Sequence, residues 1–254
     1  MMPFDISKTD TGWTLTPRLA PDFEERVVAF LDILGFTDLV RRSTNDEQAR
    51  VLLRNVLLTI ESECGLDATI GSGLPLIYSQ GSDSIIISCP ARPEIVGVML
   101  MRLQLLQGHL LSMHAVLCRG GVTVGPLVHA GNVFYGPAYL EALALEESAA
   151  MPMIAISEPV MKLLEGWPEC FAHIRRDVRG VPFIDYFWSS ADGQGLQASG
   201  FTQHRAQIER LLSTPAAADE RVRAKYDWLV SYFNAAVKRS PASEVPLLER
   251  RAAP

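Results

Sequence analysis

Two acidic residues stand next to strand-like segments, where carboxylates can bind divalent metals. Asp32 lies in residues 27–36, which open as a continuous apolar, β-branched run typical of a strand buried on both faces. Asp83 begins the second β-rich run of residues 76–88, after a turn that contains Gly81. A carboxylate at the end of a buried strand is costly unless it is paired or bound to metal. A lone acid of this kind more often caps a turn, but two strand-adjacent acids can share two divalent ions.

Gly35 follows the first strand and permits a tight turn in which backbone N–H groups face an anion. The residues after it favour a helix, and the dipole of that helix would attract a phosphate group. A metal-binding carboxylate beside a phosphate-binding loop indicates metal–nucleotide chemistry.

The elements that must position these residues follow the order of an α+β fold. Helical spacing over residues 51–60, after a possible capping box at Thr44 and Glu47, predicts a helix that ends near residue 61. The Asp83 hairpin comes next, and Pro93 suits the start of a helix over 95–113. A strand at 122–128, a helix at 137–148, a strand at 154–157 and a closing strand at 183–188 complete a ferredoxin-like sheet with additions.

Four segments follow from this order. Residues 1–23 form an N-terminal arm, and residues 24–190 form the core domain that carries both acids. After a Gly/Ser/Ala-rich link, helical patterns at 201–213 and 217–238 predict a C-terminal helical segment over residues 201–239. Residues 240–254, with two prolines and mixed charge, are expected to be a flexible tail.

Composition excludes several classes of function. The chain has 254 residues and a net charge of −6, without a dense Lys/Arg cluster, which argues against non-specific binding of nucleic acid. Its four cysteines are scattered and lack zinc spacing, so we expect reduced core thiols in a cytoplasmic protein. The most apolar span, residues 95–106, is interrupted by Arg102 and Gln104 and is too short to cross a membrane. The first ten residues are polar and show no secretory signal.

The two acidic segments resemble those of the class III nucleotide cyclases. Residues 30–36 fit the family's opening Phe-x-Asp-Ile-x-Gly-Phe motif, and residues 81–83 fit the place of its second metal-binding Asp on a central hairpin. The run 119–128 resembles the next strand of the family, 136–146 resembles the following helix, and 153–158 resembles a later strand. The likeness covers residues 24–190.

This resemblance implies a mechanism with two divalent cations, Mn²⁺ or Mg²⁺. Asp32, Asp83 and the backbone carbonyl of Ile33 would hold the metals, and the amides of Leu34, Gly35 and Phe36 would hold phosphate oxygens. One metal would lower the pKa of the ribose 3′-hydroxyl, so that a nucleoside triphosphate yields a 3′,5′-cyclic nucleotide and pyrophosphate.

A further cation, Arg179, stands before Gly180 at the place of the family's phosphate-gripping Lys, although a plain surface charge is an equal alternative.

The chain departs from the purine cyclases at four positions. Ser79 and Val133 replace the residues that select adenine in that family, and Leu140 and Ala144 replace the Asn and Arg that stabilise the transition state. Either the chain is inactive or another cation substitutes. Because both metal-binding acids are present, we favour substitution.

Arg119 is the first candidate for the substituting cation, because it stands at the mouth of a strand; Arg41 and Arg42 are further candidates.

Tyr78 and Ser79 before the second acid are suited to a base smaller than a purine. Together with the runs at 119–128, 136–143 and 183–187, these two residues resemble the pyrimidine cyclases of the bacterial Pycsar anti-phage system. In that family the cyclic product activates a separate effector. The substrate implied is UTP, giving cyclic UMP, and CTP, giving cyclic CMP, is the alternative. A catalytically silent cyclase-like domain is a third possibility. No Gly-Gly-Asp/Glu-Glu-Phe signature supports a diguanylate-cyclase-like enzyme.

The resemblance also implies a head-to-tail homodimer with two equivalent sites. In this arrangement Asp32 and Asp83 of one chain face residues 133–140 of the other.

Overall fold

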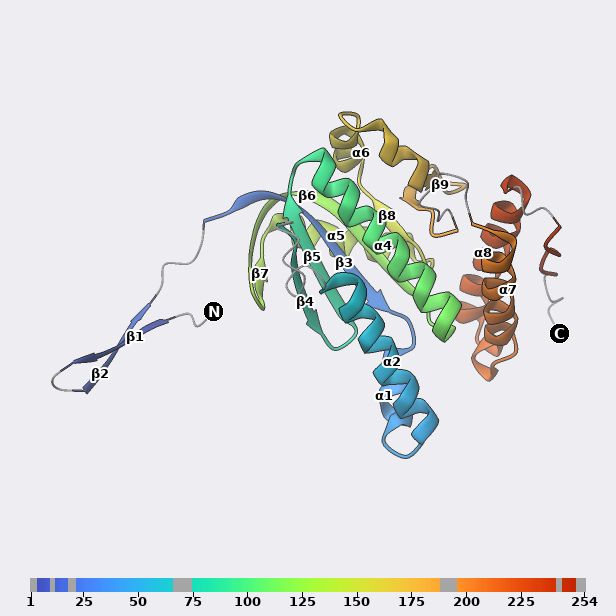
Figure 1. Ribbon diagram of the computed structural model, residues 1–254, viewed down its shortest axis with the longest axis horizontal. Helices are drawn as coiled ribbons and strands as arrows, with labels where there is room; N and C mark the ends of the chain where they lie inside the picture. The colour runs from blue at the N-terminus through green and yellow to red at the C-terminus, as the bar shows by residue number, and fades with distance from the viewer. Residues whose placement is uncertain are drawn as a thin grey trace.

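The computed structural model describes residues 4–9, 12–17, 22–65, 75–187, 196–240 and 244–249 (Figure 1). Its centre is strand β3 (Glu24–Ile33), which is buried on both faces as its sequence predicts. Val27, Ala29 and Leu31 point to one face and Val28 and Phe30 to the other, so the strand contributes to two apolar clusters.

Four antiparallel strands and two helices form a ferredoxin-like core, which confirms the predicted α+β class. The strands lie in the order β4-β5-β3-β6 within an eight-stranded sheet, and chain order alternates strand, helix, hairpin, helix, strand. The further elements of this core are α1 (Phe36–Ser43), α2 (Glu47–Cys64), β4 (Ile77–Gly81), β5 (Ser84–Pro90), α4 (Pro93–His114) and β6 (Cys118–Ala130).

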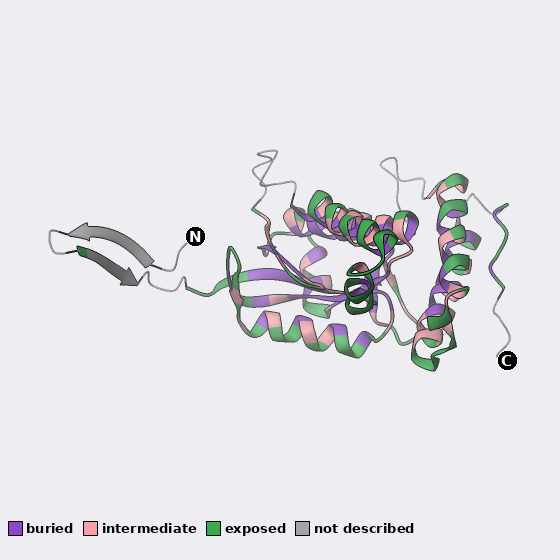
Figure 2. Ribbon diagram, turned by 90° about the horizontal axis from the view of Figure 1, so that it is seen from below, coloured by how far each residue is buried: buried purple, intermediate pink, exposed green. Residues whose placement is uncertain are grey.

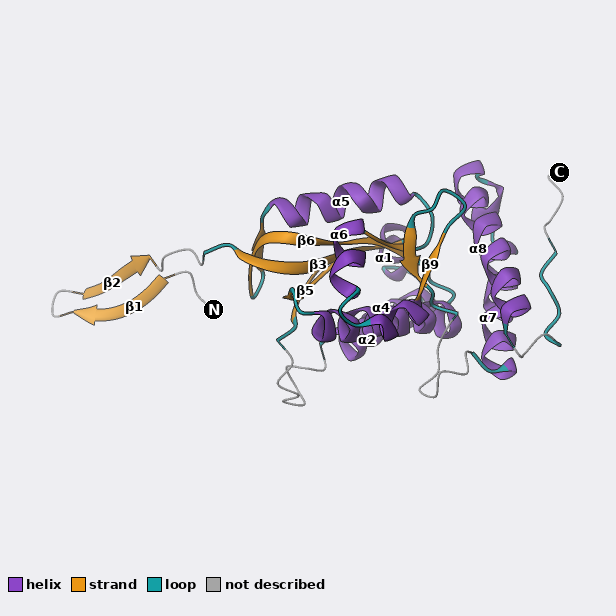
Figure 3. Cartoon of the chain, turned by 90° about the horizontal axis from the view of Figure 1, so that it is seen from above, coloured by secondary structure: helices purple, strands orange, loops and turns teal. Residues whose placement is uncertain are grey.

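The sheet continues beyond β6 by a parallel crossover. Strand β8 lies parallel to β6, and the connecting helix α5 covers the face of the sheet opposite to α2 and α4 (Figure 3). Strand β10 pairs with β8 and with β9, while β7 pairs with the end of β6. These elements are β7 (Val133–Tyr135), α5 (Pro137–Ala149), β8 (Ile154–Ile156), α6 (Glu158–Leu164), the 3-10 helix η1 (Pro168–His173), β9 (Ile174–Arg176) and β10 (Pro182–Ile184).

The central strands β3, β5 and β6 are mostly buried, and the helices expose their outer sides (Figure 2). By length and composition α4 is apolar enough to cross a membrane, but 61% of its most apolar window is buried within the fold. It packs beside α2 and against the sheet, as expected of a core helix. All four cysteines are buried free thiols, and burial raises the pKa of Cys89 and Cys118 to about 12.

The C-terminal helices pack directly on the core. Helix α7 (Ala198–Leu212), the 3-10 helix η2 (Pro215–Ala218) and helix α8 (Glu220–Arg239) stand at one end of the sheet (Figure 3). Tyr186, Phe187 and Phe233 join the two parts through ring contacts. The fully buried Asp185 accepts hydrogen bonds from Arg175 and from Arg239 of α8. This segment therefore covers one end of the sheet.

Two local expectations differ from the structure. Helix α2 begins at Glu47 and is capped by Asp46, which accepts a hydrogen bond from the Gln48 amide at 2.8 Å. The predicted capping box at Thr44 is therefore wrong, because Thr44 instead follows the end of α1.

Part of the expected flexible tail is also packed. Residues 244–249 are held by Asn234, whose side-chain amide exchanges two hydrogen bonds of 2.8 Å with the backbone of Leu248. Leu248 and Val245 are buried against the C-terminal helices, which explains why this stretch is ordered. Residues 241–243 and 250–254 lie outside the described chain. In the N-terminal arm, β1 (Phe4–Thr9) and β2 (Gly12–Pro17) form an antiparallel pair.

Candidate active site

Asp32 lies where three strands meet at one end of the sheet. It is in register with Ser84 of β5 and with Arg119 of β6, and its side chain points to the face that α5 covers. Arg119 Nε donates a hydrogen bond to Asp32 Oδ2 at 3.2 Å and also forms an ion pair with Glu146 of α5. Arg119, which the sequence predicts for charge stabilisation, is thus hydrogen-bonded to Asp32, the first predicted metal-binding acid.

Close packing of α5 brings Glu146 to this cluster. A Cβ on Gly121 of β6 would lie 2.3 Å from the carbonyl oxygen of Ala142, so only glycine allows the helix to approach the sheet this closely. Glu146 is 3% exposed, and burial raises the pKa of its carboxyl while the Arg119 guanidinium opposes the rise.

Lys225 of α8 belongs to the same electrostatic cluster. Burial and the charge of Arg119 lower the pKa of its ammonium group, while Asp32 and Glu146 act in the opposite direction. Two carboxylates, Asp32 and Glu146, and two cations, Arg119 and Lys225, therefore interact at one end of the sheet.

Asp83 reaches the same end through the β4–β5 turn. Its carbonyl oxygen accepts a hydrogen bond from the Ile33 amide at 3.1 Å, and it directly precedes Ser84, the partner of Asp32. The Asp83 carboxylate makes no hydrogen bond or ion pair with any described residue. It is therefore available for a ligand.

The donor set at this end suits hard divalent cations. Two carboxylates and nearby backbone carbonyls are the oxygen ligands that Mg²⁺ and Mn²⁺ prefer. Within the described ranges, no group of three or more His, Cys, Asp and Glu side chains is arranged to hold a metal ion. A metal here would thus depend on Asp32, Asp83 and backbone oxygen such as that of Ile33, and Arg119 would have to share Asp32 with it.

The loop after β3 has the form of an anion site. Gly35 has φ 78°, in the left-handed region, and it caps the start of α1. The Leu34 amide is already used, because it donates to the Leu117 carbonyl at 2.8 Å. The amides of Gly35 and Phe36, and those of the next two residues, have no acceptor in the described part of the chain.

Arg179 holds the end of α5. Its guanidinium pairs with Asp177 at 2.9 Å and donates to the carbonyls of Ser148 and Ala149 at 3.4 and 3.2 Å. Both carbonyls lie in the last turn of α5, where carbonyl groups lack partners within the helix, so the contact stabilises the helix that carries Glu146.

Tyr78 and Ser79 point to opposite faces of β4. Tyr78 packs toward the α2 and α4 side, and its hydroxyl donates to Gln80 at 2.6 Å. Ser79 is buried on the other side, where it donates to the Gly131 carbonyl at 2.6 Å and bonds with His129 at 2.9 Å. The structure brings neither side chain to the Asp32 cluster.

The four positions that differ from purine cyclases are not gathered at Asp32 of the same chain. Val133 and Leu140 are 57% and 64% exposed, and Ala144 lies one turn after Leu140 on the exposed side of α5. Of the two alternative cations in α1, Arg42 pairs with Asp38 at 2.9 Å and Arg41 is exposed.

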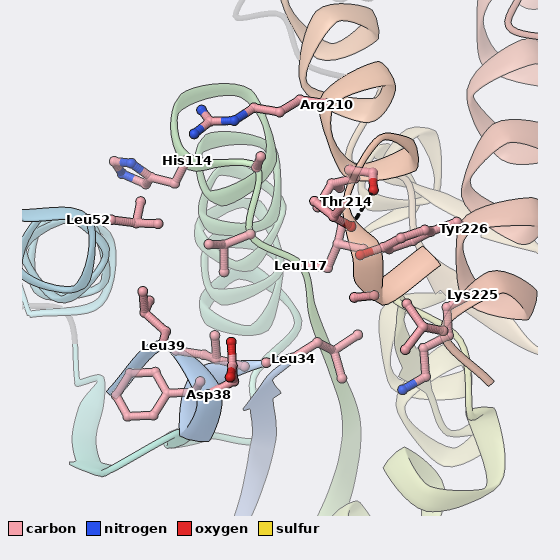
Figure 4. A pocket seen from close by; sticks show the side chains of 18 of the residues that line it. Leu34, Asp38, Leu39, Leu52, His114, Leu117, Arg210, Thr214, Lys225 and Tyr226 are labelled. Carbon is pink, nitrogen blue, oxygen red and sulfur yellow. Dashed lines mark hydrogen bonds between the residues drawn. The ribbon is translucent and has the colours of Figure 1, made fainter. Parts of the chain in front are cut away.

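A cleft of about 610 Å³ opens beside the loop after β3 (Figure 4). Its walls are this loop with α1, the connection from α4 to β6, and the C-terminal helices. Lys225 and Tyr226 of α8 and Arg210 of α7 face it from the C-terminal side. The volume lies within the usual range for small-molecule sites.

Glu146 and Lys225 did not emerge as site residues from the sequence. Glu146 had a usable signal, because it continues the buried stripe of Ala138 and Ala142 on α5, and a charge on an apolar helix face needs a partner. Lys225 had none, since only the packing of α8 on the sheet brings it near Asp32.

No family model matches the chain, and no curated protein matches it. Among solved structures, the guanylyl cyclase domain of the RhoGC fusion protein from the aquatic fungus Blastocladiella emersonii is 14% identical, with a TM-score of 0.47 over 66% of this chain and 98% of that one. The catalytic core of a rhodopsin-guanylyl cyclase with converted specificity, in complex with ATPαS, is 15% identical, with a TM-score of 0.44 over 65% of this chain and 96% of that one. A class III adenylyl cyclase-like ATP-binding protein from Pseudomonas aeruginosa is 15% identical, with a TM-score of 0.39 over 56% of this chain and 35% of that one. Each of these TM-scores is below 0.5, so we infer the function from the site's own residues.

Proposed function

We propose that this chain is a class III nucleotide cyclase that converts a nucleoside triphosphate to a 3′,5′-cyclic nucleotide and pyrophosphate. One observation carries the proposal. Asp32, the Asp83 turn, Arg119 and the free amides after Gly35 lie at the same end of a ferredoxin-like sheet. Carboxylates, a cation and an amide-lined turn are the groups needed to hold a metal-bound triphosphate.

In this proposal the acidic residues bind the metal ions, whereas the amides and Arg119 bind the phosphate groups. Two divalent ions on Asp32, Asp83 and the Ile33 carbonyl would lower the pKa of the ribose 3′-hydroxyl and screen the phosphates. The N–H groups of Gly35 and Phe36 can donate hydrogen bonds to phosphate oxygens, since they have no acceptor among the described residues. Arg119 carries the positive charge nearest to Asp32 and would stabilise charge that develops at the reacting phosphorus.

A pyrimidine substrate is the finer part of the proposal. Neither Ser79 nor Val133 carries a charge, and the Ser79 hydroxyl is engaged by Gly131 and His129. The chain therefore has no ionic group at the positions where purine cyclases select adenine. We propose UTP, with CTP as the alternative, and the likeness to Pycsar cyclases favours a cytoplasmic role in anti-phage defence through a cyclic-nucleotide-responsive effector.

The proposal includes a homodimer. Leu140 and Ala144 lie on the exposed side of α5, so they can meet the acids of a second copy but not those of their own chain. Tyr135, 40% exposed, and Phe23, 56% exposed, form an edge-to-face ring pair near the same end of α5, which adds apolar surface there.

A silent nucleotide-binding domain is the second candidate. The observation that favours it is the apolar character of Leu140 and Ala144, where active purine cyclases have Asn and Arg. Such a domain would bind nucleotide through the same loop without converting it.

Incubation with each of the four nucleoside triphosphates and Mn²⁺, followed by mass spectrometry, separates these functions. We expect cyclic UMP from the wild-type protein and none from Asp83→Ala or Asp32→Ala. Asp83→Ala is the cleaner variant, because the Asp83 carboxylate has no partner among the described residues whose loss would disturb the fold. Its melting temperature should stay close to that of the wild type. Unchanged turnover in either variant would refute the two-metal site, and nucleotide binding without product would favour the silent domain.

A further inference from the structure

The C-terminal helices contribute two cations to the cleft beside the phosphate-binding loop. Lys225 comes from α8 and Arg210 from the last turn of α7, and both line this cleft (Figure 4). Neither side chain forms a hydrogen bond or an ion pair with any residue of the described ranges. Two cations that face one cleft without a bound partner indicate an anionic ligand.

The other charged side chains in the cleft do not neutralise them. Asp38 is already paired with Arg42 at 2.9 Å, so this pair adds no net charge. His114 shares a hydrogen bond with Thr59 at 2.8 Å, and burial lowers the pKa of its ring, so it is neutral near pH 7. Among the residues that line the cleft, Lys225 and Arg210 are therefore left without an ion-pair partner, while Asp32, Glu146 and Asp219 act on Lys225 from outside the lining.

Lys225 borders the cleft and also interacts with the acid cluster, whose members Asp32, Arg119 and Glu146 do not line the cleft. Its ammonium group interacts electrostatically with Asp32, Glu146 and Arg119, while its side chain borders the cleft that contains Gly35 and Phe36. A ligand that bridges the metal-binding acids and the free amides of the loop would thus pass directly by Lys225.

We propose that the C-terminal helical segment adds a polyphosphate-binding subsite beside the metal-binding acids of its own chain, with Lys225 and Arg210 binding the polyphosphate of the nucleotide. This inference rests on the proposed cyclase function. Lys225 would take the role that the sequence suggested for Arg179, which instead holds Asp177 and the end of α5. Arg210 lies farther out and would contact the terminal phosphate or the departing pyrophosphate.

Calorimetric titration with inorganic tripolyphosphate tests the site without requiring catalysis. We expect the wild-type protein to bind it, Lys225→Gln to bind about tenfold or more weakly, and Arg210→Gln to bind a few-fold more weakly, as charge-assisted contacts predict. Lys225→Arg should keep most of the affinity. Lys238→Gln is the matched control, because Lys238 is an exposed lysine on the same helix outside the cleft.

A second measurement separates failure of this inference from failure of the proposed function. If the wild type makes a cyclic nucleotide but Lys225→Gln and Lys238→Gln bind tripolyphosphate equally, the inference is refuted and the cyclase function stands. If no nucleotide is converted but tripolyphosphate binding depends on Lys225, the cleft is a polyanion site and the cyclase proposal fails. A wild-type protein that does not bind tripolyphosphate refutes the inference, and binding of UTP tests whether the same cations act on the nucleotide. Melting temperatures of all variants should stay close to one another, since neither side chain forms a hydrogen bond or an ion pair with a described residue.

Discussion

Arg119 links two acids with different surroundings. It donates to Asp32, whose side chain is 25% exposed, and it forms an ion pair with the buried Glu146. Its guanidinium therefore has a structural task, to compensate Glu146, and a proposed chemical task beside the reacting phosphates. The two tasks make different demands, because a buried carboxylate needs only a positive charge, whereas transition-state stabilisation needs that charge in one position.

We predict that Arg119→Ala lowers kcat far more than it changes KM, since contacts made only in the transition state act on the chemical step. It should also lower the free energy of unfolding by about 1–3 kcal/mol, because Glu146 is left buried without a cation. The double variant with Glu146→Gln is the control. It should recover stability in denaturant titration but not turnover, and recovery of both would assign Arg119 to structure alone.

At this scale the sequence predicts the residues whose position depends on local pattern. Asp32 and Asp83 are predicted by their places at the ends of β-rich runs. Gly35 is predicted by its place between the first of these runs and a helix. Glu146 and Lys225 depend on how α5 and α8 dock on the sheet. Docking is decided by contacts between distant segments, and a single sequence carries little information about them.

Two glycines at helix contacts differ in the room that a Cβ atom would have. A Cβ on Gly121 would meet the Ala142 carbonyl at 2.3 Å, whereas a Cβ on Gly108 of α4 would lie 3.6 Å from its nearest atom, the Tyr186 carbonyl oxygen. The first distance forces backbone to move, and the second is ordinary van der Waals contact.

The same substitution should therefore have opposite effects. Gly121→Ala should cost about 2 kcal/mol or more of unfolding free energy, because α5 must lift from the sheet. Gly108→Ala should gain about 0.5–1 kcal/mol, since alanine stabilises a helix interior. Denaturant titration of both variants measures this, and Gly121→Ala with wild-type stability would contradict the close packing of α5.

A chain of hydrogen bonds joins β3, β4, β5 and β6 on the α5 side of the sheet. Arg26 donates to the Ser88 hydroxyl at 3.0 Å, Ser88 bonds with His129 Nδ1 at 2.8 Å, and His129 Nε2 bonds with Ser79 at 2.9 Å. Because the Ser79 hydroxyl donates to the Gly131 carbonyl, His129 carries its proton on Nε2. Burial first, and then the nearby Arg26, lower the pKa of His129 to about 4.

This pKa predicts a loss of stability in acid. The folded state binds fewer protons than the unfolded state between pH 6.5 and about 4, so the contribution of His129 is complete above pH 6.5 and is lost as the pH falls through this window. The loss should reach about 2–3 kcal/mol. His109, whose pKa is raised by its hydrogen bond with Glu63, acts in the opposite direction.

The prediction is tested by comparing unfolding free energies at pH 7 and pH 4.5 for the wild type and His129→Gln. The variant should be less stable at pH 7 and should lose less on acidification. Equal pH dependence in both proteins would mean that His129 titrates normally.

The order of the elements could be read from the sequence with few errors, because each strand and helix carries its own periodic pattern. The β3, β5 and β6 runs and the α4 and α5 helices lie where apolar spacing predicts them. The packing of residues 244–249 could not be predicted. Two prolines and mixed charge suggest a free tail, whereas among the described residues the Asn234 side chain and the apolar cluster of the C-terminal helices hold Leu248 in place.

At the scale of the whole molecule, one chain supplies only half of the proposed site. Its acids and amides lie at one end of the sheet, while Val133 and Leu140 are exposed on the other side of α5 and β7. A two-fold dimer would bring the acids of each copy to the exposed α5 surface of the other, and it would give two equivalent sites.

We expect light scattering to give a dimer at assay concentration. Leu140→Glu should yield an inactive monomer, because a charge buried in an apolar contact between subunits is costly. The melting temperature of this monomer should show that its fold is intact, since the Leu140 side chain is 64% exposed in its own chain.

Complementation then tests which surfaces meet. A chain with Asp83→Ala lacks one metal-binding acid, and a chain with Ala144→Trp blocks the exposed α5 surface; each should be inactive alone. Mixed in equal amounts with free exchange, half of the dimers contain both chains, and each of these has one intact site, so about a quarter of the wild-type activity should return. Two chains that both carry Asp83→Ala serve as the control and should stay inactive. A protein that is fully active as a monomer would refute the shared site, whereas a dimer without complementation would mean that the acids and the α5 surface of the two copies do not meet.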